Sequence, residues 1–318
     1  MKLAPKTSLF LLSLVMISGV MISGLSTARA DVQVEAAPET ASMTAPVATT
    51  VAPPSAATPA PVPTPVPTPI DAVSPVPEMK TSLYRKILSQ GVPKESLDRI
   101  LKFVNESRGH EINVDAYTCQ GQDAANLKPC DQSKRSHITK TLKVEDRDNV
   151  AVVDMSLPSL TPRFFLIHLK SGEVEKYLTT HGKGSGKGLI PYKFGNHQDS
   201  NMTALGLYQT GDVYHSDTHG TVLRLYGLEK SDDRSYERDI VVHGADYADA
   251  KFAKTTNPAT GQPYDRLGLS WGCPALSYGI VKDIIGKLKA GSILDIYQKD
   301  LMEAARSNSE VSIPEPTL

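Results

Sequence analysis

The sequence predicts a mainly β fold of the α+β type, with a helical hairpin before the sheet and one helix near its end. From Asn149 onward, short runs rich in Val, Ile, Tyr, Phe and Thr alternate with turns of Gly, Asp and Ser. That pattern is typical of strands joined by turns. Apolar residues recur at helical spacing at 80–107 and again at 275–291, which predicts the helices.

The first 30 residues are expected to be a signal peptide. Lys2 and Lys6 precede an apolar stretch, and Ala-Arg-Ala at 28–30 matches a cleavage site before Asp31. The apolar stretch is short and interrupted by Ser and Gly, which disfavours the alternative of an uncleaved membrane anchor. We therefore expect an exported protein of the periplasm or cell envelope, or a secreted one, with no stable membrane insertion after cleavage.

Residues 31–78 are expected to be a disordered linker. They hold 12 of the chain's 23 prolines, are otherwise mostly Ala, Thr and Val, and include no aromatic residue. Such a composition cannot bury enough apolar surface to offset the entropy lost on folding. We expect a semi-extended polyproline-II spacer.

A helical hairpin is expected at 79–110. Gly91 separates its two helices, and Pro93 suits the start of the second. The apolar faces consist of Leu83, Ile87 and Leu88 in the first helix and Leu97, Ile100, Leu101 and Val104 in the second.

A larger domain is expected at 111–300, followed by a C-terminal tail at 301–318. Residues 107–148 are polar and predict no regular element. A helix is expected at 275–291, where Gly291 is a natural C-cap. The strands are expected at 150–156, 163–170, 173–180, 205–211, 221–228, 238–244 and 292–298.

The charge of the chain argues against nucleic-acid binding. Its 318 residues carry a formal net charge of -1, with both signs mixed. A nucleic-acid-binding protein would normally show a basic patch or a high isoelectric point. The sequence also shows no metal-ligand pattern, so we expect no nucleic-acid partner, no metal and no cofactor.

Cys119 and Cys130 are expected to form a disulfide. Three cysteines are an odd count for an exported chain, so two are expected to pair and one to stay free. These two lie close together in a polar segment, and an oxidising compartment favours their pairing. A metal site that also uses His110 or His137 is the alternative, although the spacing matches no zinc pattern.

Cys273, the remaining cysteine, is a candidate nucleophile. Ser270, Trp271 and Gly272 precede it as a turn, and Pro274 after it suits the first position of a helix. A cysteine at the N-cap of that helix would have its thiol pKa lowered by the helix dipole. The alternative is an inert buried cysteine, which behaves as a small core residue.

His243 is the candidate base for this thiol. It ends a predicted strand and is followed by Gly244. A nucleophilic thiol needs a positioned base, and histidine commonly fills that role. A histidine at the end of a strand is otherwise more often structural.

These residues resemble those of the murein L,D-transpeptidase catalytic-domain family, in its second YkuD-like branch. The general family motif is a His followed at a distance by Ser/Thr-His-Gly-Cys; here His243-Gly244 is followed by Ser270-Trp271-Gly272-Cys273. The resemblance covers 149–298, about half the chain. The matching stretches are DMSLPSLTPRFFLIHLKSGEV, HGKGSGKG, LGLYQTGDVY, LRLYGLE, RDIVVHGADY and RLGLSWGCPAL.

The resemblance implies a two-sheet β core with a helix after the catalytic cysteine. It also implies an enzyme that acts on peptidoglycan stem peptides. Cys273 attacks the carbonyl that joins the third residue to the terminal D-alanine, and D-alanine leaves. An acceptor amine then resolves the thioester into a 3→3 cross-link. His243 is the general base, the N–H groups of Gly272 and Cys273 form much of the oxyanion hole, and Ser270 holds the turn and the histidine.

The chain departs from the general family pattern at two positions. Trp271 replaces a second His, and Ala275 replaces the Asn or Arg found two residues after the cysteine in many members. Both changes fit the second branch, but they put in doubt a substrate-carboxylate contact credited to that Arg.

Further residues are candidates for substrate binding because of this resemblance. Those expected at the site are Gly244, Trp271, His181 and Tyr208. Weaker candidates are His215 and His219 for lining the cleft and Arg163 and Arg224 for binding carboxylates, the last two being equally plausible as structural charges.

Two other functions remain open on the sequence alone. An L,D-carboxypeptidase would form the same thioester and let water resolve it. A peptidoglycan-binding protein without activity would need no nucleophile, and the presence of His243, Ser270, Gly272 and Cys273 weighs against it.

Overall fold

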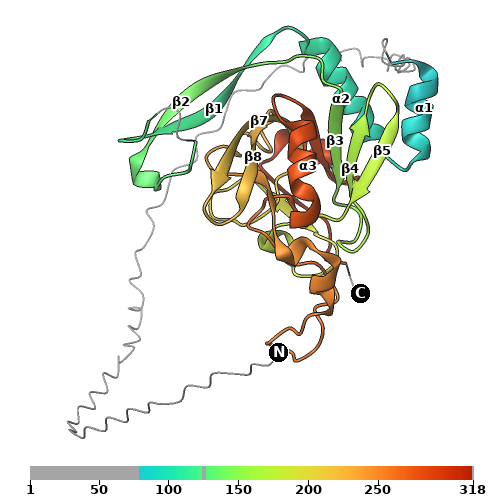
Figure 1. Ribbon diagram of the computed structural model, residues 1–318, viewed down its shortest axis with the longest axis vertical. Helices are drawn as coiled ribbons and strands as arrows, with labels where there is room; N and C mark the ends of the chain where they lie inside the picture. The colour runs from blue at the N-terminus through green and yellow to red at the C-terminus, as the bar shows by residue number, and fades with distance from the viewer. Residues whose placement is uncertain (1–78, 124–126, 317–318) are drawn as a thin grey trace, which may run out of the picture. The chain divides into compact units, whose positions relative to one another are not determined.

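An eight-stranded mixed β-sheet forms the centre of the protein in the computed structural model (Figure 1). The structure describes residues 79–123 and 127–316, so the predicted signal peptide and linker lie outside the described residues. The strands lie in the order β10-β9-β8-β7-β11-β3-β4-β5. Their bounds are β3 (Asn149–Asp154), β4 (Phe164–His168), β5 (Glu173–Tyr177), β7 (Gly206–Ser216), β8 (Gly220–Gly227), β9 (Val241–Gly244), β10 (Ala275–Leu276) and β11 (Ile293–Tyr297).

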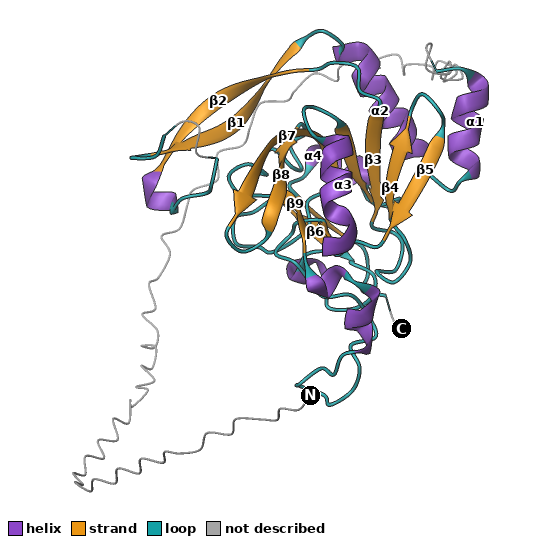
Figure 2. Ribbon diagram, viewed as in Figure 1, coloured by secondary structure: helices purple, strands orange, loops and turns teal. Residues whose placement is uncertain are grey.

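Within the described residues, two smaller sheets and four α-helices complete the fold (Figure 2). The antiparallel hairpin of β1 (Glu111–Cys119) and β2 (Arg135–Lys143) is one small sheet, and β6 (Lys193–Gly195) with β12 (Glu310–Ser312) is the other. The helices are α1 (Thr81–Ser89), α2 (Lys94–Ser107), α3 (Tyr278–Leu288) and α4 (Met302–Ser307). Short 3₁₀ turns are η1 (Gln132–Lys134), η2 (Lys183–Ser185), η3 (Asp246–Ala248) and η4 (Ala250–Lys254). None of the helices at 79–123 and 127–316 is long and apolar enough to cross a bilayer.

Helices α2 and α3 cover opposite faces of the central sheet. Asp295 of β11 accepts hydrogen bonds from Ser96 and Arg99 of α2. Asn149 of β3 donates to the Lys287 carbonyl of α3. Leu294, the neighbour of Asp295, pairs with Ala151 of β3. Ala151 and Asn149 are two residues apart, so Leu294 and Asn149 lie on the same face of the sheet. Because neighbouring strand residues point to opposite faces, α2 and α3 lie on opposite sides of the sheet.

The mainly β class is confirmed, and strands form at all seven predicted places. The strands expected in a two-sheet core belong to one continuous eight-stranded ladder. The β1–β2 hairpin was not predicted, since its burial is confined to a few positions such as Val114, Ala116 and Tyr117. Residues after 300 are also structured, because Met302 and Ala305 of α4 are buried in the main core.

The prediction for the helix after Cys273 was wrong at both ends. Ala275 and Leu276 pair with β9 as strand β10, so α3 begins at Tyr278, with Ser277 as its N-cap. Its C-cap is Lys289; Gly291 instead lies in the following turn with φ +104°. Cys273 is therefore not the N-cap of a helix.

Candidate active site

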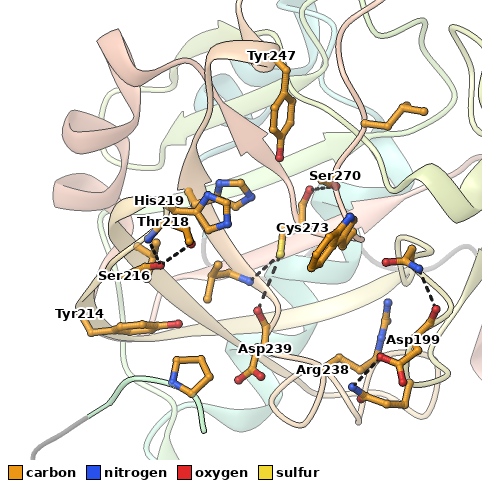
Figure 3. A pocket seen from close by; sticks show the side chains of 18 residues that line it. Asp199, Tyr214, Ser216, Thr218, His219, Arg238, Asp239, Tyr247, Ser270 and Cys273 are labelled. Carbon is orange, nitrogen blue, oxygen red and sulfur yellow. Dashed lines mark hydrogen bonds between the residues drawn. The ribbon is translucent and has the colours of Figure 1, made fainter. Parts of the chain in front are cut away.

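Cys273 lines a cavity of about 660 Å³ (Figure 3). It is half-buried and is the free cysteine of the part of the chain that the structure describes. The Val241 N–H points to its Sγ at 3.5 Å, and the thiol faces the Asp239 carbonyl oxygen at 3.9 Å. The thiol is thus held at the end of strand β9 and opens into the cavity.

Strand β9 places His243 in the same cavity. Ala275 pairs with His243 across the parallel β10–β9 ladder, which sets Cys273, two residues earlier, beside Val241. Val241 and His243 share a strand face because they are two residues apart. Both His243 and Cys273 line the cavity.

The His243 ring has a fixed tautomer. Its Nδ1 lies 3.0 Å from the Gly244 carbonyl oxygen; since a carbonyl only accepts, Nδ1 carries the proton and Nε2 has a free lone pair. Gly244 itself packs on α3, where an added Cβ would lie 2.4 Å from Tyr278 Cδ1. Gly244 therefore orients the His243 ring, and it does not line the cavity, as its predicted role in substrate binding would require.

The turn before Cys273 is closed by Ser270. Its Oγ donates to the Cys273 carbonyl oxygen at 2.7 Å and accepts the Gly272 N–H at 3.1 Å. Its backbone also pairs with the 181–183 segment. Gly272 has φ +120°, and a Cβ there would lie 2.6 Å from the Met202 carbonyl oxygen, so only glycine fits this turn.

These contacts correct the predicted oxyanion hole. The Gly272 N–H already donates to Ser270 Oγ and does not point into the cavity as a free donor. Within 79–123 and 127–316, the Cys273 N–H has no acceptor. It is therefore the backbone donor available to a developing oxyanion.

The protonation states also differ from the prediction. Burial is the main influence on Cys273 and raises its thiol pKa, although the Val241 N–H and Arg238 oppose it. Burial lowers the pKa of His243 to about 4, and the neighbouring His219 adds to that effect. At neutral pH the site therefore holds a neutral thiol beside a neutral imidazole, and not the thiolate that a helix N-terminus would favour.

His219 is a second histidine at the site, from the turn between β7 and β8. Its ring lies on the His243 ring with centroids 4.0 Å apart, and Figure 3 shows it beside the cavity above Thr218. Burial lowers its pKa. The sequence had suggested His219 only as a cleft-lining residue, because the contact forms across the fold and leaves no local motif.

Two predicted substrate-binding residues lie elsewhere. His181 is fully buried, between Arg163 Nη2 at 2.9 Å from its Nδ1 and the Gly186 carbonyl oxygen at 3.2 Å from its Nε2. Tyr208 is also fully buried, and its hydroxyl donates to the Ala204 carbonyl oxygen. Contrary to the predictions, neither side chain lines the cavity. The Tyr208 hydroxyl and His181 Nε2 satisfy buried backbone carbonyls, and His181 Nδ1 bonds to the Arg163 side chain.

Trp271 does line the cavity, and its ring is 73% exposed. Four further residues that sequence reasoning missed also line it (Figure 3): Tyr214, Arg238, Asp239 and Tyr247. Arg238 donates to the backbone carbonyls of Gly195, in β6, and Met202, so it ties β6 to the loop at Met202. These residues come from separated segments, and no spacing rule connects them.

The other predicted residues support the walls of the site. Arg224 is buried and bonds to Asp239 and to the Leu127 carbonyl oxygen, while Arg163 holds His181. A disulfide joins Cys119 to Cys130, and His215 does not line the cavity. The described residues contain no group of three or more His, Cys, Asp or Glu side chains arranged to hold a metal.

A family model for the L,D-transpeptidase catalytic domain matches residues 123–297, more than half of the chain. A search of curated proteins found no match. Among solved structures, L,D-transpeptidase 1 of Mycobacterium tuberculosis has 13% identity and a TM-score of 0.27, over 50% of this chain and 66% of that one. An L,D-transpeptidase from Mycobacterium smegmatis has 12% identity and a TM-score of 0.29, over 50% and 63%. An L,D-transpeptidase from Stackebrandtia nassauensis has 11% identity and a TM-score of 0.27, over 68% of this chain and 88% of that one. This chain spans less than two thirds of the two mycobacterial structures.

Proposed function

Because this chain belongs to the family of L,D-transpeptidase catalytic domains, we propose that it transfers acyl groups between peptidoglycan stem peptides. The donor is a stem whose third residue is joined to a terminal D-alanine. Cys273 forms a thioester with the third residue, and D-alanine leaves. An amine of a second stem resolves the thioester, which gives a 3→3 cross-link.

The first half of the reaction uses the neutral thiol of Cys273 and the neutral imidazole of His243, which we call the neutral pair. As Cys273 Sγ attacks the donor carbonyl carbon, its proton passes to His243 Nε2, whose lone pair is free. The carbonyl oxygen gains negative charge, which the Cys273 N–H stabilises. The C–N bond then breaks, and the protonated His243 gives its proton to the departing amine of D-alanine.

The second half reverses these roles. The acceptor amine attacks the thioester carbon and gives a proton to His243 Nε2. The C–S bond breaks, the sulfur takes the proton back from His243, and the free thiol returns. The Gly244 carbonyl holds the imidazole through Nδ1 and stabilises the charged ring in both halves, much as a carboxylate does in other triads.

One observation carries this proposal most directly: a free thiol and a tautomer-fixed neutral histidine line one open cavity. The family and the predicted signal peptide together support action in the cell envelope, on the periplasmic side or outside the cell. The chemistry needs no cofactor.

The test uses residues 31–318 and a disaccharide-tetrapeptide muropeptide, read by mass spectrometry beside Cys273→Ala. We expect cross-linked dimers and free D-alanine from the wild type and neither from the variant. Tripeptide without dimers would identify a carboxypeptidase. If the wild type leaves the tetrapeptide intact after reduction as well as before it, the catalytic proposal is wrong and a binding role gains support.

A further inference from the structure

A second cavity, of about 580 Å³, adjoins the one that holds Cys273. The two cavities share Asn201 and Leu269 in their walls. The Lys183 ammonium, which lines the second cavity, lies 5.2 Å from the centre of the Trp271 ring, which lines the first. A ligand can therefore extend from one cavity into the other beside Trp271.

The second cavity is basic. Lys183, Lys187 and Arg266 line it, and no carboxylate side chain does. Arg266 is half-buried; its Nη1 donates to the Leu267 carbonyl oxygen, and its guanidinium lies over the Tyr264 ring. Three cations that gather in one hollow without a carboxylate suit an anionic ligand. We call this hollow the basic subsite.

The glycine-rich loop fixes the basic subsite to the catalytic turn. A Cβ on Gly182 would lie 2.3 Å from the Asn201 carbonyl oxygen, and one on Gly184 would lie 2.1 Å from that of Ser200, so only glycine lets this loop pack so closely. The Lys183 N–H donates to the Ser270 carbonyl oxygen at 2.8 Å. The loop thus buries its backbone and leaves Lys183 and Lys187 exposed toward the cavity.

Aromatic side chains form the other wall. Phe252 and Tyr264 stack with ring centroids 4.6 Å apart, and both line the basic subsite. They give an apolar surface beside the three cations. An amphipathic ligand with a carboxylate and an aliphatic chain, such as a peptide end, suits this combination.

We propose that the basic subsite binds the carboxylate-bearing end of the acceptor stem peptide. This inference rests on the proposed function. It assigns the acceptor to a place apart from the donor, and so concerns the step that separates cross-linking from hydrolysis.

The chemistry favours the acceptor over the donor. The donor loses its terminal carboxylate together with D-alanine, and its new terminus is held as the thioester. The acceptor arrives with its terminal carboxylate intact. Its amine must reach the thioester carbon from the side that D-alanine left, because His243 serves both proton transfers. A carboxylate site next to the cavity of Cys273 holds that stem in place while its amine reacts.

The binding test uses Cys273→Ala protein and a disaccharide-tripeptide, which lacks the D-alanine a donor must lose. Calorimetry compares its C-terminal acid with its C-terminal amide. We expect the amide to bind about tenfold more weakly, as the loss of one charge-assisted contact predicts. Lys187→Glu should weaken binding of the acid by a similar factor, Lys187→Arg should restore it, and the exposed Lys282→Glu on α3 should leave it unchanged.

The turnover test measures the ratio of dimer to tripeptide product from disaccharide-tetrapeptide. We expect Lys187→Glu to lower that ratio about tenfold relative to Lys282→Glu. Equal binding of acid and amide, or equal ratios in the two glutamate variants, would overturn the basic subsite even if the wild type makes dimers. Carboxylate-dependent binding in a protein that never consumes tetrapeptide would support the subsite and reject the proposed function.

Discussion

At the scale of single residues, two groups with pKa values shifted by burial define the site. Burial raises the pKa of the Cys273 thiol and lowers that of His243 to about 4. Both shifts favour the uncharged form, as burial does for acids and bases alike. The thiol is therefore neutral at neutral pH, and the proposed mechanism requires His243 to take its proton as the bond to substrate forms.

This pair predicts a particular pH dependence. Alkylation of Cys273 by iodoacetamide should be slow at pH 6 to 8 and rise only toward or above the ordinary thiol pKa of about 8.5. Acyl transfer needs neutral His243, so its acid limb should fall near pH 4 and not near 6.5. The rate of Cys273 alkylation as a function of pH checks the first statement. The pH profile of kcat/KM checks the second.

Both measurements need a control that shows the protein to be folded at each pH. Burial lowers the pKa values of His181 and His243 to about 3 and about 4, so below pH 6.5 these two groups bind fewer protons in the folded chain. Burial also raises the pKa of Asp295 to about 7 and raises that of Asp232, so these carboxyls bind more protons in the folded chain. The histidines therefore destabilise the fold as the pH falls and the two carboxyls stabilise it, so circular dichroism must accompany each rate. Fast alkylation that is already constant at pH 5 in folded protein would show a resting thiolate and contradict the neutral pair.

At the scale of elements, the β1–β2 hairpin supports Cys273 through Asp239. The Asp239 carboxylate binds Arg135 of β2, Tyr117 of β1 and Arg224 of β8. Its carbonyl oxygen faces the Cys273 thiol. The polar sequence of the hairpin predicted none of this, because its contacts are made to residues about a hundred positions away.

The disulfide stabilises this hairpin, which gives a prediction. Cys119 and Cys130 are 11 residues apart, and a closed loop of that length is worth about 3 kcal/mol in the chain-entropy model. The double variant Cys119→Ser/Cys130→Ser should lose that amount of unfolding free energy in urea titrations. Reduction of the wild type should reproduce the loss; an unchanged midpoint in both would show that the bridge adds nothing to stability.

At the scale of the whole molecule, the N-terminal helices belong to the core of the catalytic domain. Ile87, Leu97 and Ile100 are fully buried and join the cluster that contains β3, β4 and β11. Arg99 of α2 pairs with Asp295 and Glu229. The boundary predicted near residue 110 remains a prediction, but the packing describes one hydrophobic core on both sides of it.

A substitution in α2 tests whether the N-terminal helices unfold together with the rest of the domain. Ile100→Ala should lower the unfolding free energy of the whole domain by about 2–5 kcal/mol, the range for large-to-small changes in a core, with one cooperative transition. Lys102→Ala, an exposed position on the same helix, should change it by less than about 0.5 kcal/mol. A separate early transition in the Ile100 variant, with tryptophan fluorescence of the main domain unaffected, would show that the hairpin folds alone.

The sequence by itself determined the positions of seven strands of the central sheet, the two N-terminal helices and the candidate pair His243 and Cys273. Each depends on local signals: alternating β-branched runs, helical spacing of apolar residues, and a glycine-bearing turn around one free cysteine. Tertiary structure decided what no local signal carries. The two residues Ala275 and Leu276 pair with β9 and so separate Cys273 from α3. Burial then sets the protonation of the thiol, and His219 reaches His243 across the fold. Burial and long-range pairing depend on which segments meet, and a pattern along one chain does not record that.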